Sequence, residues 1–271
     1  MTTPTTTRNK DALPIEQALH QFLAVRRPTP KVWPPDTTSI QIEVEATPEW
    51  PDGGRVPVVL HRRGDGPPAL LVHGWQSQAA DLMPMANVLM AAGFSVWVPD
   101  LPGHGHSAGA HLAIPLAAAT LREAGRLAGP FAVALGHSYG AASLVHALTQ
   151  GLSADRVVLL AAPTHYGHFA RFAAGKAGLT EAQIQTLLQR LHEVSGEDPD
   201  RINMRRQVSG LTQPALLMHS TDDPVVPAAD LRAVADRWRG ARWRPLEGLG
   251  HFRLLDDPGV LAEVCGFASG A

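Results

Sequence analysis

The sequence predicts a doubly wound α/β fold, in which helices cover both faces of a mostly parallel sheet. From about residue 69 onward, short apolar runs alternate with stretches of helical periodicity, and this alternation indicates crossover connections between parallel strands. The runs are almost continuously apolar, as expected of strands that are buried on both faces. We therefore expect strands at residues 69–72, 94–98, 131–135, 157–161, 215–218 and 243–246.

The stretches between these runs carry apolar residues at helical spacing. We expect helices at residues 81–92, 113–127, 139–148, 228–238 and 258–268. Two more strands precede the alternating region. Ile40, Ile42 and Val44 alternate with polar residues, as in a half-buried strand, and residues 56–61 form a second strand before a turn at Asp65-Gly66.

The alternation is interrupted once, between Pro163 and Leu211, where no strand pattern is found. Residues 180–194 instead predict an amphipathic helix that begins with a capping box at Thr180 and Gln183. We interpret residues 163–210 as a small helical lid. The apolar face of its helix is formed by Ile184, Leu187, Leu188, Leu191 and Val194.

The lid divides a core that we assign to residues 37–162 and 211–271. Residues 1–36 form a polar arm, rich in threonine and proline, with one short helix that we expect to lie against the main body. This helix ends before Pro28, because proline cannot easily continue a helix.

Composition excludes several classes of protein. The chain has 271 residues and a formal net charge of −2, so it lacks the general basic surface that typifies nucleic-acid binding. Its single cysteine, Cys265, excludes an internal disulfide and a cysteine-based zinc site. No apolar run approaches the roughly 20 residues that span a bilayer, and the first residues lack the apolar core of a secretory signal. We expect a soluble protein of the cytoplasm.

The most informative motif is Gly-x-Ser-x-Gly at residues 136–140, between an expected strand and an expected helix. A sharp turn at this point places Ser138 in strained backbone geometry at the carboxyl edge of the sheet. The N-terminus of the following helix favours a developing negative charge. Ser138 is therefore a candidate nucleophile, and a helix-capping serine in a glycine-rich turn is the alternative.

A serine nucleophile needs a base, and the base needs an orienting acid. The pair Asp222-Asp223 follows the strand expected at residues 215–218, and His251 follows the strand expected at residues 243–246. These segments and Ser138 all lie at the carboxyl ends of parallel strands, where open α/β sheets place their sites. The order serine, aspartate, histidine matches one hydrolase architecture and differs from the two common protease orders.

With these residues the chain resembles the serine hydrolases of the α/β-hydrolase fold, from about residue 39 to the C-terminus. The resemblance rests on segments at residues 71–75, 100–107, 136–140, 222–227 and 250–251. It implies that Ser138 is the nucleophile and His251 the general base. It assigns the acid to Asp223, which precedes a Pro-Val-Val-Pro segment, and leaves Asp222 as the alternative.

The same resemblance implies an oxyanion hole formed by the backbone N–H groups of Trp75 and Tyr139. Gly74 lets this loop turn and borders the substrate. We expect Leu187 and Leu191 of the lid to contact the substrate as well, and a purely structural core is the alternative for this apolar face. No metal and no organic cofactor is required.

Two partial motifs point elsewhere but are incomplete. His104-Gly105-His106 begins like a His-x-His-x-Asp-His metal motif, yet Ala108 and Gly109 stand where aspartate and histidine are required. Residues 103–105 also begin like a dinucleotide-binding loop, but Ala108 replaces its third glycine. We therefore expect neither a metal nor a nucleotide here.

These observations predict a serine hydrolase that cleaves a small or medium carboxylic ester, a small-molecule substrate, through an acyl-enzyme. Thioester hydrolysis, C–C bond hydrolysis and acyl transfer can use the same triad and stay open. A non-catalytic relative of the fold that binds a small molecule is the alternative of another class. The intact set of Ser138, Asp223 and His251 argues against it, because a binding module needs no base and acid.

Overall fold

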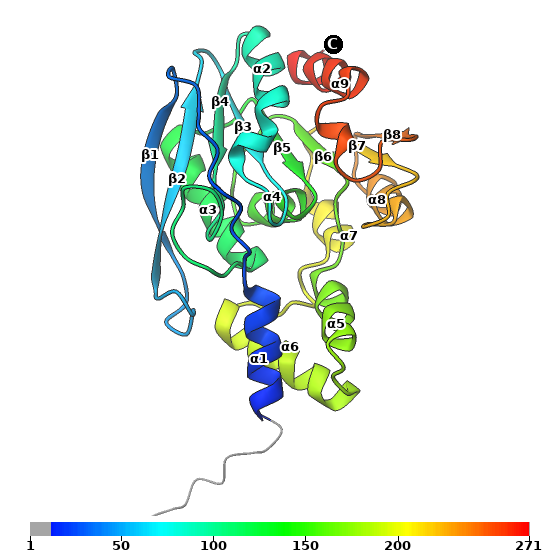
Figure 1. Cartoon of the computed structure of the whole chain (residues 1–271). Coiled ribbons are helices and arrows are strands. Elements are labelled where there is room, and N and C mark those ends of the chain that lie inside the picture. The colour runs from blue at the N-terminus through cyan, green and yellow to red at the C-terminus, as the bar shows by residue number, and fades with distance from the viewer. Residues whose placement is uncertain (1–11, 271) are drawn as a thin grey trace, which may run out of the picture.

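The computed structural model describes residues 12–270, which form one eight-stranded sheet with helices on both faces (Figure 1). The order of the strands is β1-β2-β4-β3-β5-β6-β7-β8. β2 pairs antiparallel with both β1 and β4, and the other neighbours are parallel. The strands are β1 (Thr38–Glu45), β2 (Arg55–Arg63), β3 (Pro68–Val72), β4 (Ser95–Pro99), β5 (Val133–His137), β6 (Val157–Leu160), β7 (Ala215–Ser220) and β8 (Ala241–Leu246).

The central strands are buried on both faces because their side chains alternate between two apolar cores. In β3, Leu70 and Val72 face one core, whereas Ala69 and Leu71 face the other. The helices α3 (Ile114–Ala128), α4 (Tyr139–Thr149) and α8 (Ala228–Ala235) cover the first core, and α2 (Met83–Ala91) and α9 (Pro258–Ser269) cover the second. The α/β class and the doubly wound arrangement are thus confirmed.

The differences from the expected strands are local. β1 and β2 pair antiparallel, and β2 adds to the outer side of β4, so the first strands of the chain form one end of the sheet. β5 begins at Val133 rather than at Phe131, because Phe131 pairs only through an isolated bridge with Ala154.

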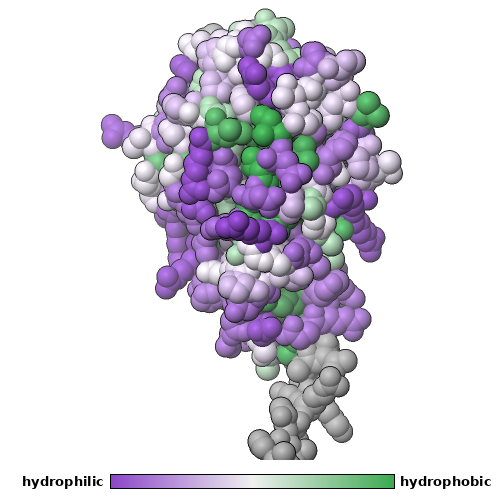
Figure 2. Space-filling model, turned by 90° about the vertical axis from the view of Figure 1, so that its left-hand side faces the viewer, coloured by the Kyte–Doolittle hydropathy of each residue, from purple (hydrophilic) through white to green (hydrophobic). Residues whose placement is uncertain are grey.

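The β1 edge of the sheet is polar. Gln41, Glu43 and Glu45 are exposed along β1, and charged side chains on an edge strand oppose pairing with a further strand. Figure 2 views the molecule from this side and shows a largely hydrophilic surface around a few hydrophobic residues. No helix within residues 12–270 is long and apolar enough to cross a membrane.

The interval between β6 and β7 is helical, as the sequence indicated. It contains α5 (Tyr166–Lys176), α6 (Glu181–Ser195) and α7 (Met204–Gln207). α6 begins at the expected capping box, in which the Thr180 N–H donates to Gln183 Oε1 over 2.9 Å. α5 was not expected, because two of its large apolar residues, Phe169 and Phe172, are exposed and mask its periodicity.

The N-terminal helix α1 (Ala12–Leu23) packs mainly against α5 and α6 (Figure 1), and its apolar residues join the first core. Its residues Ile15, Leu19 and Leu23 are buried. Arg190 of α6 also pairs with Glu16 of α1, with 2.7 Å between Nε and Oε1. α1 thus removes the apolar face of α6 from solvent.

The apolar face of α6 is therefore structural core, which gives a first prediction. Leu191 is fully buried, so Leu191→Ala should lower the free energy of unfolding by roughly 2–5 kcal/mol. The control is Leu127→Ala on α3, where half of the side chain is exposed and the loss should be much smaller. Urea unfolding measures both. Equal small losses would mean that α6 is not packed as described.

Candidate active site

Ser138 stands on a strained turn between β5 and α4. Its φ and ψ angles are 51° and −122°, in a region that non-glycine residues rarely adopt. The flanking glycines make the turn feasible. A Cβ atom at Gly136 would overlap the backbone of Ala141, and one at Gly140 would overlap the carbonyl oxygen of His73. The Ser138 N–H donates to the Leu160 carbonyl over 2.8 Å, which ties the turn to the end of β6.

Three predicted residues meet at this edge of the sheet. The distance from Ser138 Oγ to His251 Nε2 is 2.9 Å, and that from His251 Nδ1 to Asp223 Oδ2 is 2.7 Å. Asp223 Oδ1 accepts hydrogen bonds from the N–H groups of Val225 and Val226, at 2.7 and 3.0 Å. Burial opposes ionisation of Asp223, but hydrogen bonds from His251 and these amides outweigh it and lower its pKa.

The ionised carboxylate fixes the proton positions in this chain of hydrogen bonds. Because Asp223 can only accept, His251 Nδ1 carries the proton, and Nε2 is free to accept the hydroxyl proton of Ser138. The neighbouring Asp222 instead contacts the Ser220 hydroxyl and the Gly250 N–H. The structure thus brings Asp223, and not Asp222, to the histidine.

Two further histidines contact this group and were missed in the sequence. His219 Nε2 lies 2.9 Å from Asp223 Oδ2, and His137 Nε2 donates to the His251 carbonyl over 2.9 Å. Burial lowers the pKa of His137 to about 4, so its ring is neutral at pH 7. Both residues stand at strand ends beside the predicted motifs. Only the folded structure shows that their side chains point toward Asp223 and His251.

Side chains of the loop at residues 100–107 form hydrogen bonds with the backbone of this loop and of the segment at residues 76–79. The Asp100 carboxylate accepts hydrogen bonds from the backbone N–H groups of Ala79 and His106, each over 2.8 Å, and lies 3.1 Å from His61 Nε2. His104 Nε2 instead accepts from the Gln76 N–H over 3.0 Å. His104 and His106 therefore have different partners, and His104 supports the loop that carries Trp75.

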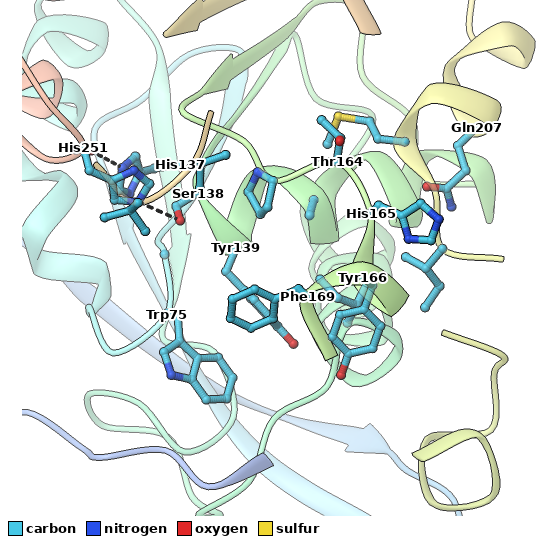
Figure 3. A pocket seen from close by; sticks show the side chains of 18 of the residues that line it. Trp75, His137, Ser138, Tyr139, Thr164, His165, Tyr166, Phe169, Gln207 and His251 are labelled. Carbon is cyan, nitrogen blue, oxygen red and sulfur yellow. Dashed lines mark hydrogen bonds between the residues drawn. The ribbon is translucent and has the colours of Figure 1, made fainter. Parts of the chain in front are cut away.

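A cavity of about 230 Å³ opens beside Ser138. Figure 3 shows Ser138 and His251 at one side of it, and Thr164, His165 and Gln207 at the other. Apolar and aromatic side chains dominate the lining, and no described lysine, arginine, aspartate or glutamate belongs to it. Its apolar and aromatic side chains include Trp75, Ile114, Tyr139, Tyr166, Phe169, Ile202, Met204, Val225, Val226 and Phe252.

The structure places most of the predicted site residues at this cavity. Gly74, Trp75 and Tyr139 line it together with Ser138 and His251. The backbone N–H groups of Trp75 and Tyr139 donate to no other group within residues 12–270, so both can serve a ligand.

The expectation for the lid residues is corrected. Leu187 and Leu191 are not part of the cavity lining, and they are 1% and 0% exposed in the core around α6. They face α1 and α5, whose apolar side chains cover them. Tyr166, Phe169 and Met204 line the cavity from the insertion instead, and the helical periodicity of residues 180–194 gave no signal for them.

The low pKa of His137 gives a second prediction. The unfolded chain binds a proton at this residue near pH 6.5, whereas the folded protein does so only near pH 4. Its contribution to stability is therefore complete above pH 6.5 and is lost as the pH falls toward 4. His137→Gln should reduce the acid-induced loss in free energy of unfolding by up to about 1.4 kcal/mol per pH unit. Urea unfolding between pH 4.5 and pH 7 tests this. The same loss as in the wild type would contradict it, and the exposed His168→Gln is the control.

Comparison with known proteins agrees with this architecture. The sequence model of the Alpha/beta hydrolase family matches residues 69–264. A pimeloyl-[acyl-carrier protein] methyl ester esterase of Xanthomonas campestris pv. campestris is 26% identical over 243 residues, which cover 74% of this chain and 94% of the relative. An esterase of Pyrococcus furiosus has the same fold, with a TM-score of 0.66, 17% identity and coverage of 92% of this chain and 99% of that one. An esterase of Thermogutta terrifontis gives a TM-score of 0.64, 16% identity and coverage of 85% and 98%. The chain belongs to the alpha/beta hydrolase family.

Proposed function

We propose that the protein hydrolyses small or medium carboxylic esters through an acyl-enzyme formed on Ser138. The observation that carries this proposal is the hydrogen-bonded chain from Ser138 through His251 to Asp223, which opens onto an apolar cavity. A binding protein needs no such chain. The relatives favour ester hydrolysis over thioester hydrolysis, C–C hydrolysis and acyl transfer, because their names describe esterases.

The proposed reaction begins when Ser138 Oγ attacks the carbonyl carbon of the ester and its proton passes to His251 Nε2. The negative charge that develops on the carbonyl oxygen is stabilised by the N–H groups of Trp75 and Tyr139, which are fixed before the charge forms. The C–O bond to the alcohol then breaks, and His251 gives its proton to the departing oxygen. Water, deprotonated by His251, attacks the acyl-enzyme, and the acid leaves as Ser138 recovers its proton.

Each group is supported by its surroundings. The turn at Ser138 exposes its hydroxyl at the N-terminus of α4, where the helix dipole favours negative charge. Asp223 is buried and ionised, so it both orients His251 and stabilises its cation. Both features act before the substrate arrives.

The cavity supports the assignment of substrate size. Its volume of about 230 Å³ is below the range of roughly 300–1,000 Å³ typical of sites for drug-sized ligands. Its lining has no charged side chain of Asp, Glu, Lys or Arg among the described residues, and an ion buried there would lack a counter-charge. A short, uncharged acyl or alkyl group fits these conditions.

The third prediction concerns the nucleophile. Ser138→Ala should remove the turnover of p-nitrophenyl acetate and butyrate, with a loss on the order of 10⁶ in kcat, because no other group can form the acyl-enzyme. Circular dichroism should show an unchanged fold. The exposed Ser153→Ala is the matched control and should keep wild-type rates. Turnover of Ser138→Ala within tenfold of the wild type would refute the proposal.

The fourth prediction separates the adjacent carboxylates. Asp223→Asn should lower kcat by about 10⁴, because the amide orients the wrong tautomer of His251 and cannot stabilise its cation. Asp222→Asn should lower kcat less than tenfold, since Asp222 does not contact the histidine. Steady-state kinetics on p-nitrophenyl butyrate compare the two variants. A larger loss at Asp222 would reverse the assignment of the acid.

A further inference from the structure

The side of the cavity opposite Ser138 carries a polar side chain that ester hydrolysis does not need. Gln207, the last residue of α7, places its amide there, and Figure 3 shows it across the cavity from Ser138 and His251. Most of the lining between these two sides is apolar.

A relay of hydrogen bonds orients this amide. His146 of α4 is 4% exposed, and its Nε2 lies 3.1 Å from the Glu197 carboxylate. Burial opposes ionisation of Glu197, but hydrogen bonds from His146 and Gln150 outweigh it and lower its pKa. Gln150 Nε2 also lies 3.1 Å from His146 Nε2, but it donates to Glu197 over the shorter distance of 2.8 Å. Because a carboxylate only accepts, we assign the proton of His146 to Nε2 and leave Nδ1 as the acceptor.

The free Nδ1 of His146 then sets the direction of the amide. Gln207 Nε2 lies 2.8 Å from Nδ1 and donates to it. The oxygen of Gln207 is thereby left as an acceptor on the other side, and Figure 3 shows it pointing into the cavity. No donor among residues 12–270 reaches this oxygen.

Two tyrosine hydroxyl groups belong to the same cavity. Tyr139 and Tyr166 line it, each residue is 7% exposed, and their hydroxyl groups lie close to one another, with the Ile114 backbone beside that of Tyr166. Burial raises the pKa of both phenols, so both remain neutral O–H donors. A phenolic hydroxyl both donates and accepts hydrogen bonds, so each of these groups can still bond to a molecule in the cavity.

We propose that this cavity selects esters whose acyl or alcohol group carries a neutral hydroxyl or amide, and that Gln207 accepts the hydrogen bond from it. The selectivity rests on the proposed function, since it concerns the substrate of the same site. A hydroxyl or amide matches the lining because it can donate to Gln207 and accept from a tyrosine. In this arrangement His146 and Glu197 are positioning residues, which act only through Gln207.

The test compares pairs of esters that differ by one terminal hydroxyl. On the acyl side these are p-nitrophenyl hexanoate and p-nitrophenyl 6-hydroxyhexanoate, with four-carbon and eight-carbon pairs, and on the alcohol side butyl acetate and 4-hydroxybutyl acetate. Wild-type protein should prefer the hydroxylated member of at least one pair. In Gln207→Met, which keeps the length but loses the amide, the ratio of kcat/KM values should fall roughly tenfold, mainly through KM.

Control variants separate recognition from stability. Gln189→Met, on an exposed part of α6, should leave every ratio unchanged. Glu197→Gln should shift the ratio in the direction of Gln207→Met, because it removes the fixed acceptor for His146. A purely structural role for Glu197 would lower stability without moving the ratio, and this would overturn the relay.

The inference fails if Gln207→Met leaves the ratios unchanged or lowers kcat/KM equally for all esters. A binding measurement separates that failure from failure of the proposed function. Calorimetry on Ser138→Ala should show tighter binding of the preferred hydroxylated ester than of its alkyl partner, and Gln207→Met should remove this difference. If the hydroxylated ester binds selectively but the wild type does not hydrolyse it, ester hydrolysis is refuted and the recognition by Gln207 stands. If both esters bind equally, the recognition by Gln207 is refuted.

Discussion

The close approach of α4 to β3 is the constraint on which the site depends. The backbone of Gly140 lies against the carbonyl groups at the end of β3, and only glycine leaves room for this contact. The contact holds Ser138 at a positive φ angle, and the hydrogen bond from its N–H to Leu160 fixes the turn from the other side. The loop of Gly74 and Trp75 is brought next to Ser138 by the same contact, because it follows β3 directly. Ser138 and the backbone N–H groups of Trp75 and Tyr139 therefore share one rigid frame.

The electrostatics of this edge of the sheet follow from burial. Burial lowers the pKa values of His73, His104 and His137, so their rings are neutral and serve as fixed donors and acceptors. Asp100 and Asp223 stay ionised because backbone amides and histidines hydrogen-bond to their oxygens. Neither of these two carboxylates lines the cavity, and no other Asp, Glu, Lys or Arg among the described residues does.

The sequence predicted the parts of this arrangement that depend on local pattern. The strands, the turn at Ser138 and the carboxyl-end positions of Asp223 and His251 all followed from apolar runs and from the residues that end them. The same logic could not find His219, Tyr166 or Gln207, because their roles depend on side-chain directions across the molecule. The sequence indicated the apolar face of α6 but not the element that packs against it. Residues 184–191 could face either a substrate or another helix, and in the structure they pack against α1 and α5. Helical periodicity shows which face of a helix is apolar, but not which element packs against that face.

Trapping the covalent intermediate tests the central claim most directly. Wild-type protein is mixed with p-nitrophenyl acetate, quenched in acid during turnover, digested and analysed by mass spectrometry. The account predicts one added acetyl group on the peptide that contains Ser138, and a reduced yield of this adduct in Asp223→Asn. Turnover with no acyl adduct, or with the acetyl group on another residue, would contradict an acyl-enzyme at Ser138.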